Sequence, residues 1–374
     1  MERYLAKQVR KDLEKKMVFI GGPRQVGKTT LARNLFSKAE TGYLNWDIDE
    51  DRTKLLKRQL PDRSVWIFDE IHKYRKWRNY LKGVYDAIKV ERWAPKKILV
   101  TGSARLDYYR FGGDSLQGRY HYHRLMPLSF REIGAKNVAD LESLFRYGGF
   151  PEPFFAQSEK ETRRWTNEYA HRLFREDLTS LERITDIGTL ELMVYRLPEI
   201  VGAPFSINSL REDLQIAHAT LAKWVSILER LYLIFRISPF GAAHVKAIKK
   251  EPKLYLYNWT SVESDGPRFE NLVAVHLLKY AYWLQDTEGR RIDLRYFRLK
   301  GGEEVDFVML ENGKPFMFVE CKLNDDSVNP RLRTLVSRFP SAKAFQIHLR
   351  GKKEYQTPEG IRVCPATRLL SELI

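Results

Sequence analysis

The chain has 374 residues, of which 43% are hydrophobic and 30% charged, a composition that excludes a largely disordered protein. Its length exceeds one ordinary hydrophobic core, so two or three domains are expected. The formal net charge of +16 favours a polyanion such as nucleic acid as partner, with solubility or compositional bias as the alternative. Two cysteines exclude a disulfide scaffold, and no apolar stretch is long enough to cross a membrane. We therefore expect a cytoplasmic protein with no membrane partner.

A glycine-rich turn lies near the N-terminus, between an apolar run and an apolar-periodic segment. Met17–Ile20 is predicted to be a short buried strand, and Leu31–Leu35 the start of a helix. Between them, Gly22–Thr29 matches the phosphate-binding pattern G-x-x-x-x-G-K-[ST], in which backbone N–H groups, a lysine and a hydroxyl hold the phosphates and Mg²⁺. A plain glycine turn is the alternative. The residues that we assign to bound ATP are Gly22, Pro23, Arg24, Gln25, Val26, Gly27, Lys28, Thr29 and Thr30.

Two carboxylates follow the next strongly apolar run. Val65–Phe68 suits a parallel strand buried on both faces, and Asp69 and Glu70 come directly after it. Ligands bind at the carboxyl ends of such strands. We expect Asp69 to hold Mg²⁺ together with Thr29, and Glu70 to orient and deprotonate the attacking water. An acidic helix N-terminus is the alternative.

Further polar residues follow a third apolar run at Lys97–Val100. Thr101 or Ser103 can hydrogen-bond the γ-phosphate or its attacking water, or can be a turn hydroxyl. Arg119 can reach the γ-phosphate of a neighbouring subunit as an arginine finger, which would make the protein a homo-oligomer. A surface arginine or an intrachain salt bridge is the alternative.

The middle of the chain is predicted to be helical. Residues 151–205 read as a helical lid or linker, and residues 206–250 as a winged helix whose second helix can lie in a DNA groove or contact another protein. Its helices are expected at 208–214 and 221–231, and its strand at 233–237. A basic patch that contacts phosphate or solvates a hairpin is predicted at Lys246, Lys249, Lys250 and Lys253.

The C-terminal region carries a second constellation of charged residues. Glu304–Leu310 and Phe316–Lys322 are predicted strands around the turn signal Asn312-Gly313. Asp306 and Glu320-Cys-Lys322 have the form of the PD-(D/E)XK nuclease core, in which two acids bind Mg²⁺ and the lysine steadies or activates water. Glu270, from a preceding helix, would complete the acid set. The alternatives are an ordinary hairpin with surface charges and a nuclease-like fold without activity.

The register of this hairpin tests the nuclease interpretation. A strict two-residue turn pairs Glu311 with Lys314 and aims Asp306 away from Glu320. The interpretation therefore requires either a longer loop or a bulge within a strand. Pro315 favours the longer loop, because it cannot donate a ladder hydrogen bond.

These motifs together resemble a prokaryotic family that joins an AAA-type ATPase domain to a C-terminal domain of unknown function with a nuclease-like core. The resemblance implies a nucleotide-dependent protein that can form oligomers. In the C-terminal domain it covers Phe269–Val273, Glu304–Phe307 and Val319–Lys322, while Tyr257–Thr260 departs from it. The motifs that carry it in the N-terminal half are Gly22–Thr30, Asp69–Ile71, Thr101–Ser103, Ser115–Arg119, Pro127–Phe130 and Gly148–Glu152.

The expected fold class is α/β. We expect a parallel-sheet P-loop ATPase domain at residues 1–150, the helical and winged-helix segments, and a restriction-endonuclease-like domain at residues 251–374. The expected function is ATP hydrolysis coupled to a metal-dependent nuclease-like domain that acts on DNA. The alternatives are a nucleotide switch that binds DNA or protein and whose nuclease-like domain only docks a partner, and a sensor that assembles through Arg119.

Overall fold

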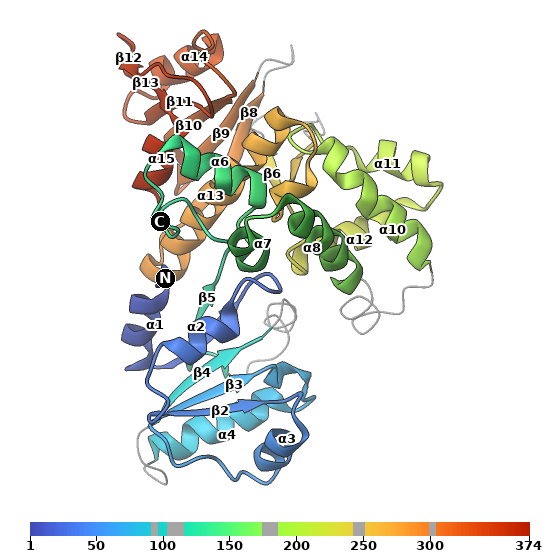
Figure 1. Cartoon of the computed structure of the whole chain (residues 1–374), viewed down its shortest axis with the longest axis vertical. Helices are drawn as coiled ribbons and strands as arrows, with labels where there is room; N and C mark the ends of the chain where they lie inside the picture. The colour runs from blue at the N-terminus through green and yellow to red at the C-terminus, as the bar shows by residue number, and fades with distance from the viewer. Residues whose placement is uncertain (91–95, 103–115, 174–185, 242–250, 299–303) are drawn as a thin grey trace. The chain divides into compact units, whose positions relative to one another are not determined.

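The computed structural model describes residues 1–90, 96–102, 116–173, 186–241, 251–298 and 304–374 (Figure 1). The chain divides into two compact units, Met1–Met126 and Pro127–Ile374. Ser103, which we expected near the γ-phosphate, lies outside the described residues, as do Lys246, Lys249 and Lys250 of the predicted basic patch.

The first unit is built on a five-stranded parallel sheet in the order β2-β3-β4-β1-β5. Every residue of β1 and β3 is buried, because helices cover both faces of the sheet (Figure 1). The strands are β1 (Met17–Gly21), β2 (Thr41–Asn45), β3 (Val65–Asp69), β4 (Lys97–Thr101) and β5 (Tyr120–Arg124). The helices are α1 (Ala6–Leu13), α2 (Lys28–Asn34), α3 (Asp49–Leu56), the short η1 (Ile71–Lys73) and α4 (Trp77–Lys89). The parallel-sheet P-loop architecture predicted from the sequence is confirmed.

The second unit contains an eight-stranded mixed sheet in the order β12-β13-β11-β10-β9-β8-β6-β7. Its centre is a run of three antiparallel strands, β8, β9 and β10, followed by β11, which is parallel to β10. The strands are β6 (Ile234–Pro239), β7 (Lys253–Leu256), β8 (Ile292–Arg298), β9 (Glu304–Glu311), β10 (Lys314–Lys322), β11 (Lys343–His348), β12 (Tyr355–Gln356) and β13 (Ile361–Pro365).

Along the chain, helices lie before and between the strands of this sheet. The long helix α13 (Asp265–Glu288) leads into β8, and α14 (Pro330–Arg338) connects β10 to β11 and packs in one hydrophobic cluster with Val308 and Phe318. The C-terminal helix is α15 (Ala366–Glu372). The other helical elements are α6 (Val138–Tyr147), α7 (Pro151–Ala156), α8 (Glu159–Arg172), α10 (Ile187–Arg196), η5 (Leu197–Ile200), α11 (Ile207–Leu214), α12 (His218–Arg230) and η7 (Trp259–Ser261).

The segment predicted as a winged helix does contain two helices and a strand. The helices are α11 and α12, and the strand is β6. However, β6 pairs with β8 through Ser238 and Pro239, and with β7 on its other side. The strand after the second helix therefore extends the eight-stranded sheet instead of standing apart from it.

Two buried polar residues of α13 hold neighbouring segments against this helix. The side chain of Asn271 accepts from the backbone N–H of Leu256 at 2.9 Å and donates to its carbonyl at 2.6 Å, which holds β7. Lys279 donates to the carbonyl of Pro127 at 2.9 Å and pairs with Glu132. Because these groups are buried, each bond avoids the cost of an unsatisfied polar atom.

The Gly148–Glu152 motif is explained by packing. A Cβ on Gly149 would lie 2.6 Å from the ring of Trp259 and 2.8 Å from the carbonyl oxygen of Leu128. Trp259 is fully buried and donates from its indole to the carbonyl of Leu144 at 3.1 Å. The lack of a side chain at Gly149 thus lets its backbone approach Trp259 and Leu128 closely.

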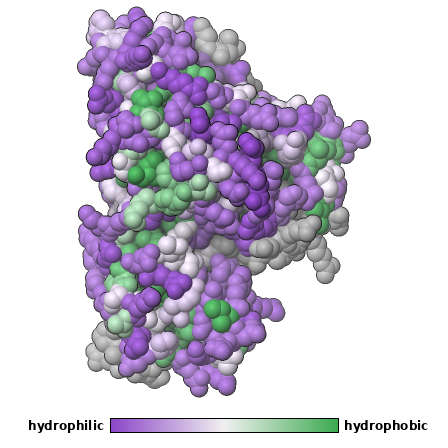
Figure 2. Space-filling model, viewed as in Figure 1, coloured by the Kyte–Doolittle hydropathy of each residue, from purple (hydrophilic) through white to green (hydrophobic). Residues whose placement is uncertain are grey.

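The viewed surface is mainly hydrophilic, with hydrophobic side chains gathered in small patches (Figure 2). In the described part of the chain, no helix combines the length and apolar character needed to cross a membrane.

The protonation of His276 predicts a pH dependence of stability. Its Nε2 accepts from the N–H of Phe130 at 3.0 Å, so Nδ1 carries the proton and donates to the carbonyl of Leu272. Burial lowers the pKa of His276 to about 4. The neutral ring therefore stabilises the fold fully above the unfolded pKa of about 6.5, and this contribution is lost as the pH falls towards about 4.

Urea unfolding between pH 7 and pH 4.5 checks this. The unfolding free energy of His276→Gln should fall less than that of the wild type, by a difference of up to about 3 kcal/mol. His171→Gln, at an exposed position of α8, is the control and should follow the wild type. Equal losses in all three proteins would contradict the assignment.

Candidate functional sites

The phosphate loop of the first unit connects β1 to α2. Gly22 has φ +126°, and a Cβ there would lie 2.2 Å from the carbonyl oxygen of Leu125, so this position requires glycine. Gly27, with φ +95°, precedes α2. The ammonium of Lys28 donates to the carbonyl oxygens of Gly22 at 2.9 Å and Pro23 at 2.5 Å. The loop therefore wraps around the lysine predicted to reach the phosphates.

Asp69, at the carboxyl edge of the sheet, accepts hydrogen bonds from three different elements. It is buried and accepts hydrogen bonds from the hydroxyls of Thr29 at 2.8 Å, Tyr43 at 2.7 Å and Thr101 at 2.6 Å. The structure thus brings together Thr29 and Asp69, the two residues predicted to share Mg²⁺. Thr101, one of the two predicted γ-phosphate contacts, binds Asp69, and the role of Tyr43 was not predicted.

Glu70 follows Asp69 in the left-handed region, with φ +55°, and its N–H donates to the carbonyl of Thr101 at 3.0 Å. Its carboxylate lies 3.4 Å from the ammonium of Lys73. Burial raises the pKa of Glu70, and the charge of Lys73 opposes this. Glu70 also precedes the short helix η1, but its side chain does not cap that helix.

Within its own chain, Arg119 lies at the opposite end of β1 from the phosphate loop. It precedes β5, whose first residue pairs with Met17 at the start of β1, whereas the phosphate loop follows the end of β1. These ends are about 13 Å apart along the strand. Arg119 instead binds Asp86, with Nε to Oδ1 at 3.0 Å. A contact with a neighbouring subunit stays a prediction.

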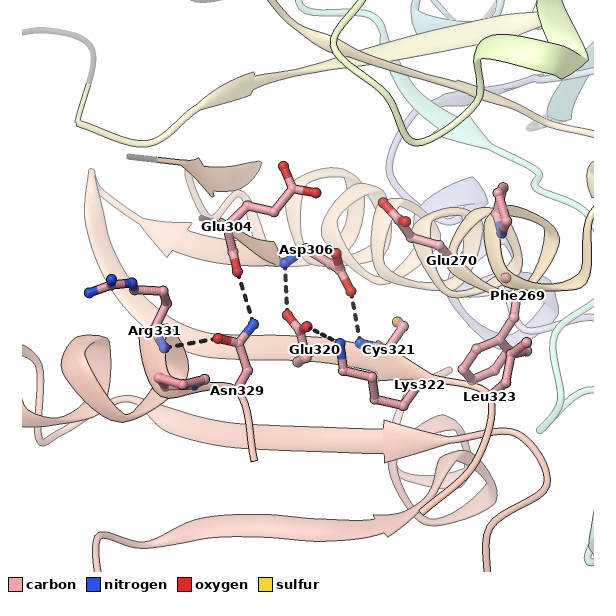
Figure 3. A pocket seen from close by; sticks show the side chains of 13 residues that line it. Phe269, Glu270, Glu304, Asp306, Glu320, Cys321, Lys322, Leu323, Asn329 and Arg331 are labelled. Carbon is pink, nitrogen blue, oxygen red and sulfur yellow. Dashed lines mark hydrogen bonds and ion pairs between the residues drawn. The ribbon is translucent and has the colours of Figure 1, made fainter. Parts of the chain in front are cut away.

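A pocket of the second unit gathers all four residues predicted for the C-terminal site. Its lining includes Glu270 from α13, Asp306 from β9, and Glu320 and Lys322 from β10 (Figure 3). Residues 329–331, at the start of α14, also line it. Helix, hairpin and the segment after β10 therefore converge on one cavity.

A bulge in β10 makes this arrangement possible. The turn is the strict two-residue type, with Asn312 at φ +50°, Gly313 at φ +80°, and Glu311 paired with Lys314. The longer loop suggested by Pro315 is therefore wrong. The register instead shifts between Pro315 and Met317, so that Val319 pairs with Phe307. The extra residue, Phe316, sets Asp306 opposite Glu320.

The two acids are held by short contacts across the strands. Asp306 accepts from the N–H of Cys321 at 2.8 Å, and its own N–H lies 3.4 Å from the carboxylate of Glu320. The ammonium of Lys322 lies 2.9 Å from the other oxygen of Glu320. Burial, reinforced by the charges of Glu270 and Glu320, raises the pKa of Asp306 well above its usual value.

The residues that surround Glu270 were not predicted from the sequence. The ammonium of Lys253 lies 3.2 Å from Glu270, 3.0 Å from Glu304 and 3.8 Å from Asp306. Tyr255 donates to Glu270 at 2.6 Å. Lys253 was assigned to an exposed basic patch, but it is fully buried. The available signal was the continuous apolar run Leu254–Tyr257, because a strand over this run places Lys253 and Tyr255 on one face.

The donor set fits one kind of metal site. Among the residues that the structure describes, no group of three or more His, Cys, Asp or Glu side chains is arranged to hold a metal ion. Mg²⁺, however, is commonly bound by one or two carboxylates, with water and substrate phosphate completing its shell. Asp306 and Glu320 in the pocket, and Asp69 beside Thr29 in the first unit, fit that pattern.

Comparisons with known proteins match three consecutive segments. Residues 14–134 match the model of an AAA domain. Residues 138–259 and 265–369 match two domains of unknown function, DUF8612 and DUF4143. The first unit is therefore a P-loop domain of AAA type, as predicted.

Relatives are similar along most of the chain. The uncharacterised protein Rv2008c of Mycobacterium tuberculosis is 23% identical, covering 95% of this chain and 81% of the relative. The uncharacterised protein MJ1637 of Methanocaldococcus jannaschii is 24% identical, covering 89% of this chain and 81% of the relative.

Among solved structures, a Walker-type ATPase of Pyrococcus abyssi has a TM-score of 0.45 and 14% identity, covering 69% of this chain and 93% of that chain. The Aeropyrum pernix Orc1 protein in complex with DNA has a TM-score of 0.34 and 12% identity, covering 72% of this chain and 90% of that chain. Both TM-scores are low, and we infer nothing further from them.

The packing of Gly202 against Glu270 predicts an unusually costly substitution. Gly202 has φ +75°, and a Cβ there would lie 3.0 Å from a carboxylate oxygen of Glu270. Gly289 has φ +69° with open space around it. Gly289→Ala should therefore cost only the backbone strain, about 1–2 kcal/mol, and Gly202→Ala should cost more.

Urea unfolding of the two variants measures the difference. Gly188→Ala, on helix α10 with no neighbour within 4 Å, is the control and should be neutral or stabilising. If Gly202→Ala destabilises no more than Gly289→Ala, Glu270 does not occupy the position described.

Proposed function

We propose that the first unit binds and hydrolyses ATP with Mg²⁺. The observation that supports this best is the meeting of Lys28, Thr29 and Asp69 at one edge of the sheet. Lys28 would bind the β- and γ-phosphates, and Thr29 and Asp69 would hold Mg²⁺, which neutralises phosphate charge. Glu70, whose pKa is raised by burial, would accept the proton of the attacking water.

We propose that the pocket of the second unit is a nuclease site that hydrolyses phosphodiester bonds in DNA. The observation that carries this proposal is the bulge at Phe316, because it sets Asp306 opposite Glu320 with Lys322 alongside. A PD-(D/E)XK core has this set of residues. The order of α13, β8, β9, β10, α14 and β11 supports a restriction-endonuclease-like core.

In this proposal each residue has a distinct role. Asp306 and Glu320 would hold Mg²⁺, which lowers the pKa of water and neutralises the phosphate. Lys322 would orient the attacking water and stabilise negative charge on the phosphoryl oxygens. Water adds to phosphorus as the bond to the leaving sugar oxygen breaks, and that oxygen takes up a proton. The net charge of +16 supports a nucleic-acid substrate.

ATP would then control the second unit. The alternative is a nucleotide switch that binds DNA or protein and whose nuclease-like pocket only docks a partner. One observation favours this alternative: the acids already have cationic or backbone partners, as a purely structural polar cluster would. Arg119 acting between subunits of a homo-oligomer is a further proposal.

Two assays, of ATP binding and of phosphate release, test the ATPase, because Lys28→Ala and Glu70→Gln should behave differently in them. Lys28→Ala should lose ATP binding, because the ammonium is the main charge expected at the phosphates. Glu70→Gln should keep ATP binding while turnover falls by about 100-fold or more, because the base is lost. Lys38→Ala, at an exposed position, is the control. Turnover at the wild-type rate in Glu70→Gln would contradict the role of Glu70.

For the nuclease, plasmid and linear DNA are incubated with the full chain in Mg²⁺ or Mn²⁺, with and without ATP. Cleavage should fall by about 100-fold or more in Lys322→Ala, which loses the group that orients the water, and in Asp306→Asn, which loses a ligand of Mg²⁺. Lys314→Ala, exposed on the same hairpin, should cleave normally. No cleavage under any condition, with ATP turnover intact, would favour the switch.

A further inference from the structure

Lys253 has an unusual environment for a lysine. It is the first residue of β7, and none of its side chain is exposed. Its ammonium lies within 4 Å of three carboxylates, those of Glu270, Glu304 and Asp306. A buried ammonium is costly unless it is paired and hydrogen-bonded, and here the acids of the pocket provide that pairing.

The charges of the pocket divide into two groups. Glu270 and Glu304 both lie within hydrogen-bonding distance of Lys253, whereas Glu320 contacts Lys322. Asp306 lies between them: it faces Lys253 at 3.8 Å and its other oxygen accepts from the backbone of Cys321. Four carboxylates and two ammonium groups leave a formal charge of −2 when all are ionised, which one divalent cation would neutralise.

We propose that Lys253 is a positioning residue that acts as the permanent cation of the pocket and limits it to one divalent ion, held by Asp306 and Glu320. This inference rests on the proposed nuclease function, which places that ion. In two-metal sites the ions lie about 3.5–4 Å apart and share acids. The ammonium of Lys253 fills the space between Glu270 and Asp306 that a second ion would need.

Residues from two different matched segments of the chain form the pocket. Lys253 and Tyr255, which hold Glu270, belong to the segment matched over residues 138–259, whereas Glu270 itself lies in the segment matched over 265–369. The hydrogen bonds of Asn271 to Leu256 fix β7 against α13 next to these contacts. Both segments therefore contribute to one site, and the cation comes from the first of them.

Counting Mn²⁺ ions tests the proposal. The full chain without nucleotide is titrated with Mn²⁺ and the free ion is followed by electron paramagnetic resonance. Asp306→Asn is the blank, so that ions bound elsewhere subtract out. The wild type should bind one ion per chain more than the blank. A difference of two ions, or of none, would overturn the proposal.

Substitution of Lys253 provides the second readout. Lys253→Met should bind Mn²⁺ about tenfold more tightly or better, because a positive charge close to Asp306 is removed. Lys253→Arg should stay at the wild-type affinity, and Lys343→Met, exposed on β11, is the control for the substitution itself. An unchanged affinity in Lys253→Met would overturn the proposal.

A further pair of variants covers the case in which Lys253→Met fails to fold. Glu304→Gln should weaken Mn²⁺ binding far less than Glu320→Gln, because Glu304 pairs with Lys253 whereas Glu320 binds the ion. Equal losses would overturn the proposal. The DNA-cleavage assay reports separately on the proposed function: a chain that binds one Mn²⁺ ion and cleaves no DNA would refute the nuclease and leave the role of Lys253 intact.

Discussion

One extra residue in a β-strand determines the geometry of the C-terminal pocket. Side chains alternate between the two faces of a strand, so a shift of one residue moves every later side chain to the opposite face. The Asn312-Gly313 turn by itself would separate Asp306 from Glu320. The bulge at Phe316 restores them to facing positions, and the hydrogen bond from Cys321 to Asp306 depends on that register. The other pocket residues are arranged around this pair.

Both units contain buried carboxylates, and the two units stabilise them by different interactions. A carboxylate buried at the end of a strand needs partners, because its desolvation is costly. Asp69 accepts hydrogen bonds from three neutral hydroxyls. The acids of the C-terminal pocket are instead satisfied by the ammonium groups of Lys253 and Lys322. The first arrangement suits a site that receives a cation with its nucleotide, and the second still leaves the negative charge that one divalent ion would neutralise.

Local patterns predicted much of the fold and of both sites. The phosphate loop, the buried strand before Asp69, and the hairpin around Asn312-Gly313 are each specified by residues close together in the sequence. The bulge was foreseen only as one of two options, and Pro315 pointed to the wrong one, because the choice depends on how β10 fits between β9 and β11. Lys253 was mistaken for a surface residue, since the acids that bury it come from distant elements. Arg119 was assigned from its motif to the nucleotide of a neighbouring subunit, and the structure of one chain shows only that it lies at the end of the sheet opposite to the phosphate loop.

We propose that the bulged hairpin forms a divalent-cation site on Asp306 and Glu320. Anomalous diffraction from crystals soaked in Mn²⁺ tests this most directly. We expect one anomalous peak in the pocket, within coordination distance of both carboxylates, with Lys253 still in contact with Glu270. A pocket without a peak, or a peak bound by Glu270 and Glu304 in place of Lys253, would contradict it.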